Sequence, residues 1–360
     1  MYSRRKFLHH STLALSSLAL PISCLGATSA DKKIGVALVG LGYYSRDLLA
    51  PALQLTQHCY LAGIVTGTAS KIPAWQKQYN IPDKNVYNYD NFDTIANNPD
   101  IDVIYVVLPT SMHSEYSVRA ANAGKHVWCE KPMAKTAAEC QAIIDACQKN
   151  KVKLSIGYRM HHEPNTQTIM RYAHEKPYGD IQAVMAEAGY RDGRSDHWKQ
   201  RKAMGGGALY DMGVYSLNGI RYAVGAEPTA VVSAKHSTTR PEIYHEVDET
   251  TEFVLQFPNG LQALGKTSFG ENLNTLRVDC AKGWYQLTPF QSYSGIRGKA
   301  SDGKVFDASI PNQQALQMDN DSLAILEDKA VRVPGEEGMR DIRIVEAIYQ
   351  SAREGRRIEL

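Results

Sequence analysis

The first part of the chain alternates short apolar runs with segments of helical periodicity. The apolar runs cover residues 34–39, 60–65, 101–108, 126–129 and 153–156. The helical segments between them cover residues 48–53, 71–79, 113–123 and 136–150. Continuous apolar strands that alternate with helices are typical of a parallel sheet covered by helices on both faces. The pattern therefore predicts an α/β fold with an N-terminal Rossmann domain, a doubly wound parallel sheet, over residues 31–156.

From residue 157 onward the expected strands follow one another more closely. They cover residues 181–188, 230–235, 251–257, 261–269 and 275–280, with helices over 209–224 and 339–353. Pro258-Asn259-Gly260 between two of the strands is a hairpin signal. These features predict a C-terminal α+β domain, residues 157–360, with a largely antiparallel open sheet. Helices cover one face of such a sheet, and the other is open to solvent or to a second subunit. We therefore expect a homodimer or homotetramer.

The first 30 residues have the composition of an export signal. Arg4 and Arg5 lie in a basic start, an apolar segment follows at 12–20, and small residues occupy 28–30. This order predicts a secretory signal, and the paired arginines followed by Phe7 and Leu8 resemble a twin-arginine signal. We expect the twin-arginine export machinery to carry the protein to the periplasm. That route exports folded proteins, which suggests a cofactor bound before export.

Charge and hydropathy narrow the classes of partner. The formal net charge of the 360 residues is +2, so no nucleic-acid partner is indicated. No stretch reaches the roughly 18 consecutive apolar residues that a membrane-spanning helix requires. We therefore expect small-molecule substrates and no membrane span.

A glycine-rich turn follows the first apolar run. Gly40 and Gly42 allow a tight turn and the close approach of a pyrophosphate to a helix N-terminus, and Ser45 fills the third position of the motif. The end of the second run, residues 66–71, contains no acidic residue of the kind that binds the ribose of NAD. The hydroxyl of Thr66 and the ammonium of Lys71 suit a 2′-phosphate instead. The sequence favours NADP over NAD.

Two later segments hold candidate catalytic groups. Lys131 lies at the C-terminal end of an apolar run and therefore faces the cofactor crevice of a parallel sheet. Asp211 and Tyr215 are four residues apart and share one face of a helix. Removal of a hydride from an alcohol also requires removal of a proton, which a tyrosine beside a lysine can accept. Asp211 would then bind the substrate or orient Tyr215.

Several segments together resemble the Gfo/Idh/MocA oxidoreductases. They are Gly40-x-Gly42, Pro109-Thr110 with His113, Ala123-Gly124-Lys125-His126-Val127, Glu130-Lys131-Pro132, Gly157-Tyr158-Arg159, and Gly205-Gly206-Gly207 with Asp211, Gly213 and Tyr215. Within the family, the chain is most similar to the glucose–fructose oxidoreductase subgroup. Further similarities are Arg221-Tyr222 before Gly225-Ala226-Glu227-Pro228, and Val345-Glu346-Ala347-Ile348-Tyr349 near the C-terminus. Thr110 stands where asparagine is common, and Lys199 where arginine is common.

The resemblance implies a role for each matching position. Lys131 would be the catalytic lysine, Tyr215 the general acid/base and Asp211 a catalytic substrate ligand. The implied cofactor contacts are Gly40, Gly42, Tyr43, Tyr44, Thr66, Lys71, Pro109, Thr110, His113, Glu130, Lys131, Arg159, Trp198 and Arg201. The implied substrate contacts are Lys131, Arg159, Asp211, Tyr215 and His162. No metal is assigned, because the adjacent His161 and His162 point in different directions and rarely supply two ligands to one ion.

The expected function joins this chemistry to export. Because a soluble cofactor would be lost in the periplasm, we expect NADP to be tightly bound and recycled in place. One sugar hydroxyl gives up a hydride, and a second sugar or carbonyl substrate takes it back. Two alternatives remain open. The protein is a redox-assisted glycosidase in the first, and a non-catalytic nucleotide-binding sensor in the second.

Overall fold

Six parallel strands form the first sheet of the structure. The computed structural model describes residues 32–360, and the export signal predicted at residues 1–30 lies outside them. The strands are β1 (Ile34–Val39), β2 (Cys59–Val65), β3 (Val86–Tyr87), β4 (Val103–Val106), β5 (His126–Cys129) and β6 (Leu154–Ile156). Their order across the sheet is β3-β2-β1-β4-β5-β6, and all neighbours are parallel. This order reverses between β1 and β4, which makes their carboxyl ends the expected place for a ligand.

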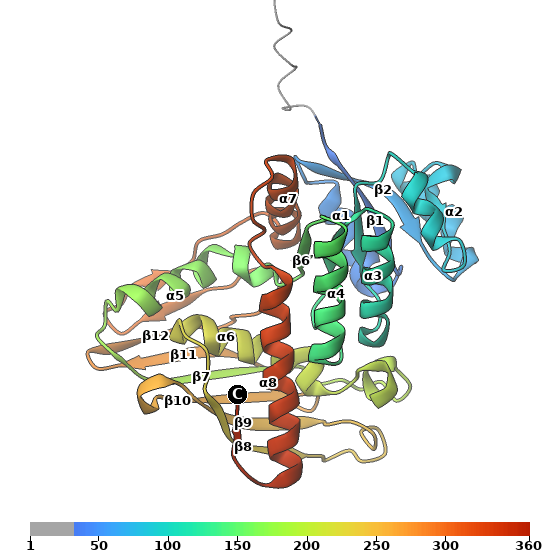
Figure 1. The fold of residues 1–360 in the computed structure, drawn as a ribbon. Coiled ribbons are helices and arrows are strands. Elements are labelled where there is room, and N and C mark those ends of the chain that lie inside the picture. Colours follow the sequence, from blue (N-terminus) through green and yellow to red (C-terminus); the bar gives the residue numbers. More distant parts are fainter. Residues whose placement is uncertain (1–31) are drawn as a thin grey trace, which may run out of the picture. The chain divides into compact units, whose positions relative to one another are not determined.

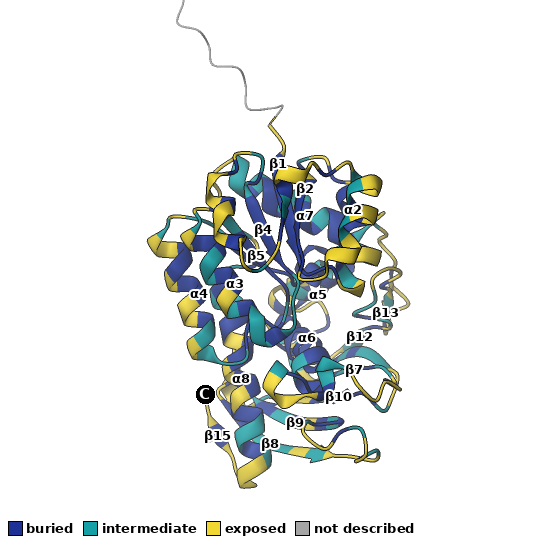
Figure 2. Ribbon diagram, turned by 90° about the vertical axis from the view of Figure 1, so that its right-hand side faces the viewer, coloured by how far each residue is buried: buried dark blue, intermediate teal, exposed yellow. Residues whose placement is uncertain are grey.

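Helices cover both faces of this sheet. They are α1 (Ala50–Leu53), α2 (Ile72–Tyr79), α3 (His113–Asn122) and α4 (Ala137–Lys149). Successive side chains of a strand point to opposite faces. Accordingly, Ala37 and Val39 of β1 belong to the apolar cluster that includes α3 and α4, whereas Val36 and Leu38 belong to the cluster that includes α1. The strands are the buried centre of this half (Figure 2). The predicted doubly wound sheet is confirmed.

One covering helix of the first sheet comes from the second half of the sequence. Helix α7 (Gln313–Leu326) contributes Ala315 and Met318 to the same apolar cluster as α1. Its Asp319 accepts hydrogen bonds from the backbone amides of Gln57 and His58, at 2.9 and 2.8 Å. The sequence pattern does not predict this helix. Much of its buried surface is polar, which removes the apolar periodicity on which such a prediction depends.

Nine strands form the second sheet. They are β7 (Ile181–Gly189), β8 (Ala230–Ser237), β9 (Thr250–Gln256), β10 (Gln262–Ser268), β11 (Leu273–Cys280), β12 (Gly283–Leu287), β13 (Gly298–Ala300), β14 (Val305–Phe306) and β15 (Ile358–Glu359). Their order is β14-β13-β12-β11-β7-β10-β9-β8-β15. The β7–β10 pair is parallel and the other pairs are antiparallel. The predicted, largely antiparallel sheet is confirmed, including the β9–β10 hairpin, in which Asn259 and Gly260 have positive φ angles.

Three helices lie on one side of the second sheet (Figure 1). They are α5 (Pro164–Glu175), α6 (Val214–Val224) and α8 (Gly335–Glu354). Helix α8 packs against α4 of the first half and β8 of the second, and so joins the two sheets. On β10 the side chains alternate, with Ala263 buried and Leu264 55% exposed. Within residues 32–360, no helix has the length and apolar character needed to cross a membrane.

The Arg221-Tyr222 and Glu227 motif has a structural role. The Arg221 guanidinium on α6 bonds to Asp341 and Glu337 of α8, at 2.6 and 2.7 Å, and to Glu227 at 2.7 Å. Asp341 is completely buried, and burial raises the pKa of its carboxyl to about 6 despite the guanidinium. This network fixes α6, which carries Tyr215, against α8.

Candidate active site

Four strands of the first sheet end at the candidate site. Gly40 follows β1, Pro109 comes shortly after β4, Lys131 follows β5 and Gly157 follows β6. Because the strands are parallel, their carboxyl ends share one edge of the sheet. Hydrogen bonds between these ends keep them in register, as from Gly40 N to Val65 O and from Glu130 N to Val106 O, both 3.0 Å. The predicted residues therefore gather at one edge, although they come from distant parts of the sequence.

The glycine turn after β1 has the shape of a dinucleotide-binding turn. Gly40 has a φ of +92°, and a side chain there would meet the carbonyl oxygen of Val107 at 2.4 Å. A side chain at Gly42 would instead enter open space, with nothing within 4 Å. The buried Ser45 hydroxyl donates a 2.5 Å hydrogen bond to the Gly40 carbonyl and closes the turn. A phosphate group can therefore approach the backbone at Gly42, and the residues present fit a dinucleotide.

Thr66 and Lys71 lie next to this turn. The Lys71 ammonium donates a 2.9 Å hydrogen bond to the carbonyl of Leu41, between the two glycines. Thr66 is buried at the end of β2, and its hydroxyl accepts from the amide of Thr68 at 3.1 Å. The two neighbouring tyrosines have different surroundings. Tyr43 is 61% exposed, whereas the ring of Tyr44 packs 5.9 Å from that of Tyr293. Thr66 and Lys71, the residues predicted to contact the phosphate of NADP, thus lie beside the glycine turn.

His113 and Thr110 connect neighbouring loops. The ring nitrogens of the buried His113 lie 2.8 Å from the carbonyls of Leu108 and Pro132, so this side chain joins the end of β4 to the Glu-Lys-Pro turn. Burial lowers the pKa of His113. Thr110 is buried against Gly205, where an added Cβ would lie 2.8 Å from the Thr110 Cβ. Both residues therefore hold loops of the site together.

Glu130 is a buried carboxylic acid next to Lys131. It accepts a 2.6 Å hydrogen bond from the Tyr105 hydroxyl and a 3.2 Å bond from the amide of Lys131. A side chain at Gly157 would approach the Glu130 oxygen to 2.6 Å, so glycine leaves the room that the carboxyl occupies. Burial raises the pKa of Glu130 to about 7, although the Tyr105 hydrogen bond and the Lys131 charge oppose the shift.

Lys131, Asp211 and Tyr215 come together as predicted. Asp211 lies in a π-helical turn (Leu209–Gly213) that leads directly into α6, and Tyr215 lies in the first turn of α6. The Lys131 ammonium donates a 2.7 Å hydrogen bond to the Asp211 carbonyl and lies 4.4 Å from the centre of the Tyr215 ring. None of the described residues hydrogen-bonds to the Tyr215 hydroxyl. A lysine cation, a carboxylate and a free phenol therefore share one site.

The charges of the cluster reinforce one another. Burial by itself lowers the pKa of Lys131. The electrostatic attraction of Tyr215, Asp211 and Glu130 is stronger than this effect, so the pKa of Lys131 is raised and its ammonium is charged. Burial alone would raise the pKa of Asp211, but the ammonium groups of Lys199 and Lys131 hold it well below its usual range. Asp211 is therefore ionised at neutral pH and accepts hydrogen bonds only.

Lys199 and Tyr190 complete the surroundings of Asp211. The Lys199 ammonium lies 2.6 Å from Oδ2 of Asp211, and the Tyr190 hydroxyl donates to the same oxygen at 3.3 Å. Neither residue was predicted as a site residue. Tyr190 had no motif to identify it. Lys199 did carry a signal, because it replaces the common arginine beside Trp198 in a segment that follows β7.

Arg159 shapes the wall beside Tyr215. Its guanidinium is buried, donates to the carbonyls of Gln291 and Ser292, and also bonds to Gln313. The same group lies 5.6 Å from the centre of the Tyr215 ring and 4.8 Å from that of Tyr293. It therefore fixes the loop after β12 against the site.

The structure places three predicted residues farther from these groups. Arg201 is exposed and pairs with Asp196 at 2.5 Å. Trp198 lies beside Lys199, whose ammonium is 5.9 Å from the indole ring. His162 is buried, and its Nδ1 lies 3.0 Å from the Asn320 amide on α7. Their predicted contacts with cofactor or sugar stay predictions.

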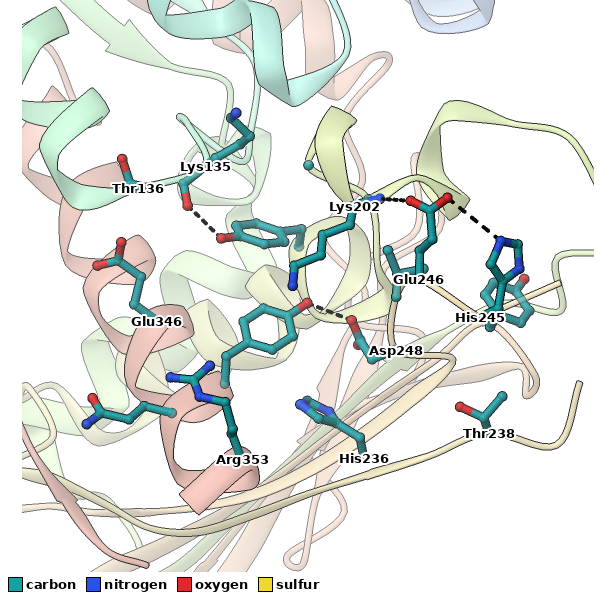
Figure 3. A pocket seen from close by; sticks show the side chains of 17 residues that line it. Lys135, Thr136, Lys202, His236, Thr238, His245, Glu246, Asp248, Glu346 and Arg353 are labelled. Atoms are coloured by element: carbon teal, nitrogen blue, oxygen red, sulfur yellow. Dashed lines mark hydrogen bonds and ion pairs between the residues drawn. The ribbon is translucent and has the colours of Figure 1, made fainter. Parts of the chain in front are cut away.

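A cavity of about 820 Å³ lies beside the glycine turn that precedes Asp211. Gly205 and Gly206 form part of its wall, together with residues of α8 and of the segment around β8 (Figure 3). Lys131, Asp211 and Tyr215 do not line it. The convergence of reactive groups, and not the size of this cavity, identifies the candidate active site.

Two family models and several known proteins are similar to this chain. The model of the oxidoreductase family with an NAD-binding Rossmann fold, GFO/IDH/MocA, matches residues 34–158, and that of a GFO/IDH/MocA C-terminal domain matches residues 166–286. The aldose-aldose oxidoreductase of Caulobacter crescentus, solved with glycerol, is 39% identical, covers 91% of this chain and all of its own, and has a TM-score of 0.88. D-xylose 1-dehydrogenase [NADP(+)] of Haloarcula marismortui is 25% identical over 90% of this chain and 92% of its own. The chain thus belongs to the GFO/IDH/MocA family of oxidoreductases.

Proposed function

We propose that this protein is an exported, NADP-dependent sugar oxidoreductase that keeps its cofactor and recycles it with a second substrate. An aldose gives up a hydride and a proton in the first half-reaction, and a second sugar or carbonyl compound takes both in the other. The observation that carries this proposal is the convergence of Lys131, Asp211 and Tyr215 beside the carboxyl ends of β4 and β5. The relatives named for aldose and xylose oxidation support a sugar as the substrate.

The side chains divide the work between binding and proton transfer. The ionised Asp211 accepts hydrogen bonds from sugar hydroxyls, while Lys131 donates one to the hydroxyl oxygen that reacts. A bound nicotinamide supplies the hydride acceptor and, after reduction, the hydride donor. Oη of Tyr215 takes the hydroxyl proton as the carbonyl forms, and the Lys131 ammonium stabilises the negative charge. In the second half-reaction Tyr215 returns this proton to the carbonyl oxygen of the incoming substrate.

NADP is the proposed cofactor because of the residues around the glycine turn. The segment 66–71 after β2 has no carboxylate that would repel a 2′-phosphate. The Lys71 ammonium is held at the glycine turn by its hydrogen bond to the Leu41 carbonyl. Thr66 directly follows the last residue of β2. A lysine and a hydroxyl provide charge-assisted hydrogen bonds to phosphate. The NADP(+) in the name of the Haloarcula relative supports the same choice.

Retention of the cofactor follows from the proposed export route. The twin-arginine leader at residues 1–30 would deliver a folded protein to the periplasm, with NADP already bound. No soluble pool would replace a cofactor that dissociates there. Oxidation of one sugar must then be matched by reduction of another compound in the same site, and the expected kinetics are ping-pong.

A spectrum of the purified mature protein tests this proposal. We expect nicotinamide bound without any addition, a rise in absorbance near that of NADPH when an aldose is added, and its loss when a second carbonyl substrate follows. Tyr215→Phe serves as the control, because Tyr215 is not among the implied cofactor contacts. This variant should keep the nucleotide but show both changes far more slowly. Protein that arrives without nucleotide and turns over only with added NADP would be an ordinary dissociating dehydrogenase, contrary to the proposal.

The open face of the second sheet is the proposed contact between subunits. Met185, Val254 and the exposed Leu264 line a shallow cavity of about 380 Å³ on this face, with charged residues between them. An exposed apolar strip on a broad sheet suits a second copy of the same surface, as in a homodimer or homotetramer. The mass in solution should then exceed that of one chain, and Leu264→Arg should lower it to one chain.

A further inference from the structure

The cavity behind the Gly205–Gly206 turn has no part in the proposed reaction. Its volume of about 820 Å³ is within the range of small-molecule binding sites. One wall comes from the C-terminal half of α8, and the opposite wall from the segment that leads from β8 to β9 (Figure 3). Residues from four parts of the sequence therefore enclose a space large enough for an organic ligand.

Helix α8 presents a polar and aromatic stripe to this cavity. Glu346, Tyr349 and Arg353 are spaced by three and four residues, so they lie on one helix face, and all three line the cavity. Glu346 and Tyr349 belong to the C-terminal motif of the sequence analysis, which the proposed active site does not use. Part of this motif thus lines the cavity and not the candidate active site.

Aromatic rings form the floor of the cavity. The Tyr349 ring packs 5.6 Å from the Tyr210 ring at an angle of 33°, and 5.2 Å from the His236 ring at 44°. The Tyr349 hydroxyl is fixed by a 2.6 Å hydrogen bond to Asp248. A rigid aromatic surface of this kind offers an apolar contact for the C–H face of a ring.

The charged groups of the cavity balance. Lys135, Lys202 and Arg353 line the cavity together with Glu246, Asp248 and Glu346, which gives three cations and three carboxylates. An anionic ligand would meet the carboxylates and a cationic one the ammonium and guanidinium groups. The cavity therefore contains groups that only donate and groups that only accept. A hydroxyl does both, so a neutral ligand with many hydroxyls can satisfy both kinds.

Both oxygens of Asp248 already accept hydrogen bonds, but other charged groups of the cavity have capacity left. Glu346 accepts one long bond, 3.3 Å from the Ala137 amide, and Lys135 lies 3.7 Å from Glu139. The backbone amide of Lys202 bonds to Glu246 at 3.0 Å, while its side chain extends into the cavity (Figure 3). Arg353 is exposed at the rim. A ligand here would add hydrogen bonds without first breaking strong ones.

We propose that this cavity is a second carbohydrate-binding site, which holds a neutral sugar unit on the Tyr349 surface between Arg353, Lys202 and Glu346. It is separate from the site of hydride transfer. Gly205 and Gly206 line the cavity, whereas Lys131, Asp211 and Tyr215 do not. The inference does not depend on the proposed reaction, because a sugar can bind here whether or not the protein oxidises it.

Calorimetric titration with D-glucose, D-xylose and maltose tests the proposal. The starting protein is the full chain with Asp211→Ala, which weakens sugar binding at the candidate active site. We expect at least one of these sugars to bind to it. Addition of Lys202→Ala and Arg353→Ala should weaken that binding at least tenfold, because both side chains are exposed donors at the cavity.

The matched control replaces the same residue types outside the cavity. Lys149→Ala and Arg343→Ala change exposed residues of α4 and α8 that do not line it, and should alter binding less than twofold. Three results would overturn the proposal. They are no sugar binding in the Asp211→Ala protein, equal weakening in the control, and binding of inorganic phosphate in place of the sugars. Absence of sugar turnover in the unmodified protein would refute the proposed function alone, since the titration measures binding only.

Discussion

The Lys199 ammonium lies 2.6 Å from Oδ2 of Asp211, on the carboxylate oxygen that Lys131 does not approach. Lys131 is 3.5 Å from the other oxygen, Oδ1, and holds the backbone carbonyl of the same residue. Two lysines from separate loops therefore hold the Asp211 carboxylate, Lys199 at Oδ2 and Lys131 on the side of Oδ1. This arrangement keeps Asp211 ionised and oriented, and leaves the Tyr215 hydroxyl available for a substrate.

Removal of the Lys199 charge should weaken sugar binding and shift the pH dependence. In Lys199→Met, Asp211 loses a charge-assisted hydrogen bond of about 1.5–3 kcal/mol, so kcat/KM should fall about tenfold to a hundredfold. The pKa of Asp211 should rise, because burial raises it and only the Lys131 ammonium would remain to lower it. The acid limb of the kcat/KM profile should therefore move to higher pH.

Lys199→Arg is the matched control, since it keeps the charge. Its acid limb should stay at the wild-type pH even if the changed shape lowers turnover. If Lys199→Met lowers thermal stability but leaves the acid limb in place, Lys199 supports the loop and does not control the ionisation of Asp211.

Tyr215→Phe should abolish most proton transfer while the site keeps its shape. The variant retains the ring that lies 4.4 Å from the Lys131 ammonium and loses only the hydroxyl. General acid–base catalysis typically contributes about 10²–10⁴-fold, so kcat should fall by that range. KM and the thermal midpoint should change little. A kcat within threefold of the wild type would assign proton transfer to another group.

The fold was largely predictable because the first sheet is buried on both faces. Strands such as β1 must then be continuously apolar, and the helices between them have one apolar face. Helix α7 escaped prediction for the opposite reason. Gln313, Gln314, Gln317 and Asp321 are buried there although they are polar, so the apolar period is lost.

The site was predictable only where a motif carried it. Lys131, Asp211 and Tyr215 lie in segments with a recognisable spacing, and the structure brings them together. Tyr190 follows β7 and contacts Asp211, which is 21 residues later in the sequence, so no local sequence pattern indicates this contact. The motif around Arg221 shows the converse, because its arginine bonds to buried carboxylates and serves the packing of α6 on α8.

Arg221 should therefore matter for stability more than its distance from the chemistry suggests. Arg221→Met leaves Asp341, which is completely buried, without its cation. Breaking a buried ion pair in this way typically costs about 3–5 kcal/mol, and urea unfolding should show a loss of that size. Arg171→Met on α5 is the control, because its pair with Glu175 is about half exposed on both sides and is worth less than about 1 kcal/mol. Equal losses in the two variants would contradict this account.

Lys71 should set the preference between NADP and NAD. Lys71→Ala removes the ammonium proposed to bind the 2′-phosphate, so affinity for NADP should fall about tenfold to a hundredfold while that for NAD changes little. Dissociation constants of both nucleotides measure this. Lys77→Ala, on an exposed position of the following helix α2, should leave both unchanged. An equal loss for the two nucleotides in Lys71→Ala would mean that Lys71 only stabilises the turn through Leu41.

Glu130 should make the protein less stable as the pH rises through neutrality. Its pKa is about 7 in the folded chain, because the carboxyl is buried, against about 4.3 when unfolded. A group with a raised folded pKa contributes stability that is fully present below pH 4 and lost as the pH rises through 7. Glu130→Gln cannot ionise, so its unfolding free energy should depend less on pH, by up to about 3 kcal/mol between pH 4.5 and 8. Urea unfolding across this range measures the difference, and comparison with the wild type cancels the titration of Asp321 and Asp341. Parallel curves for the two proteins would show that Glu130 is already ionised near pH 4.5, held in that form by Lys131.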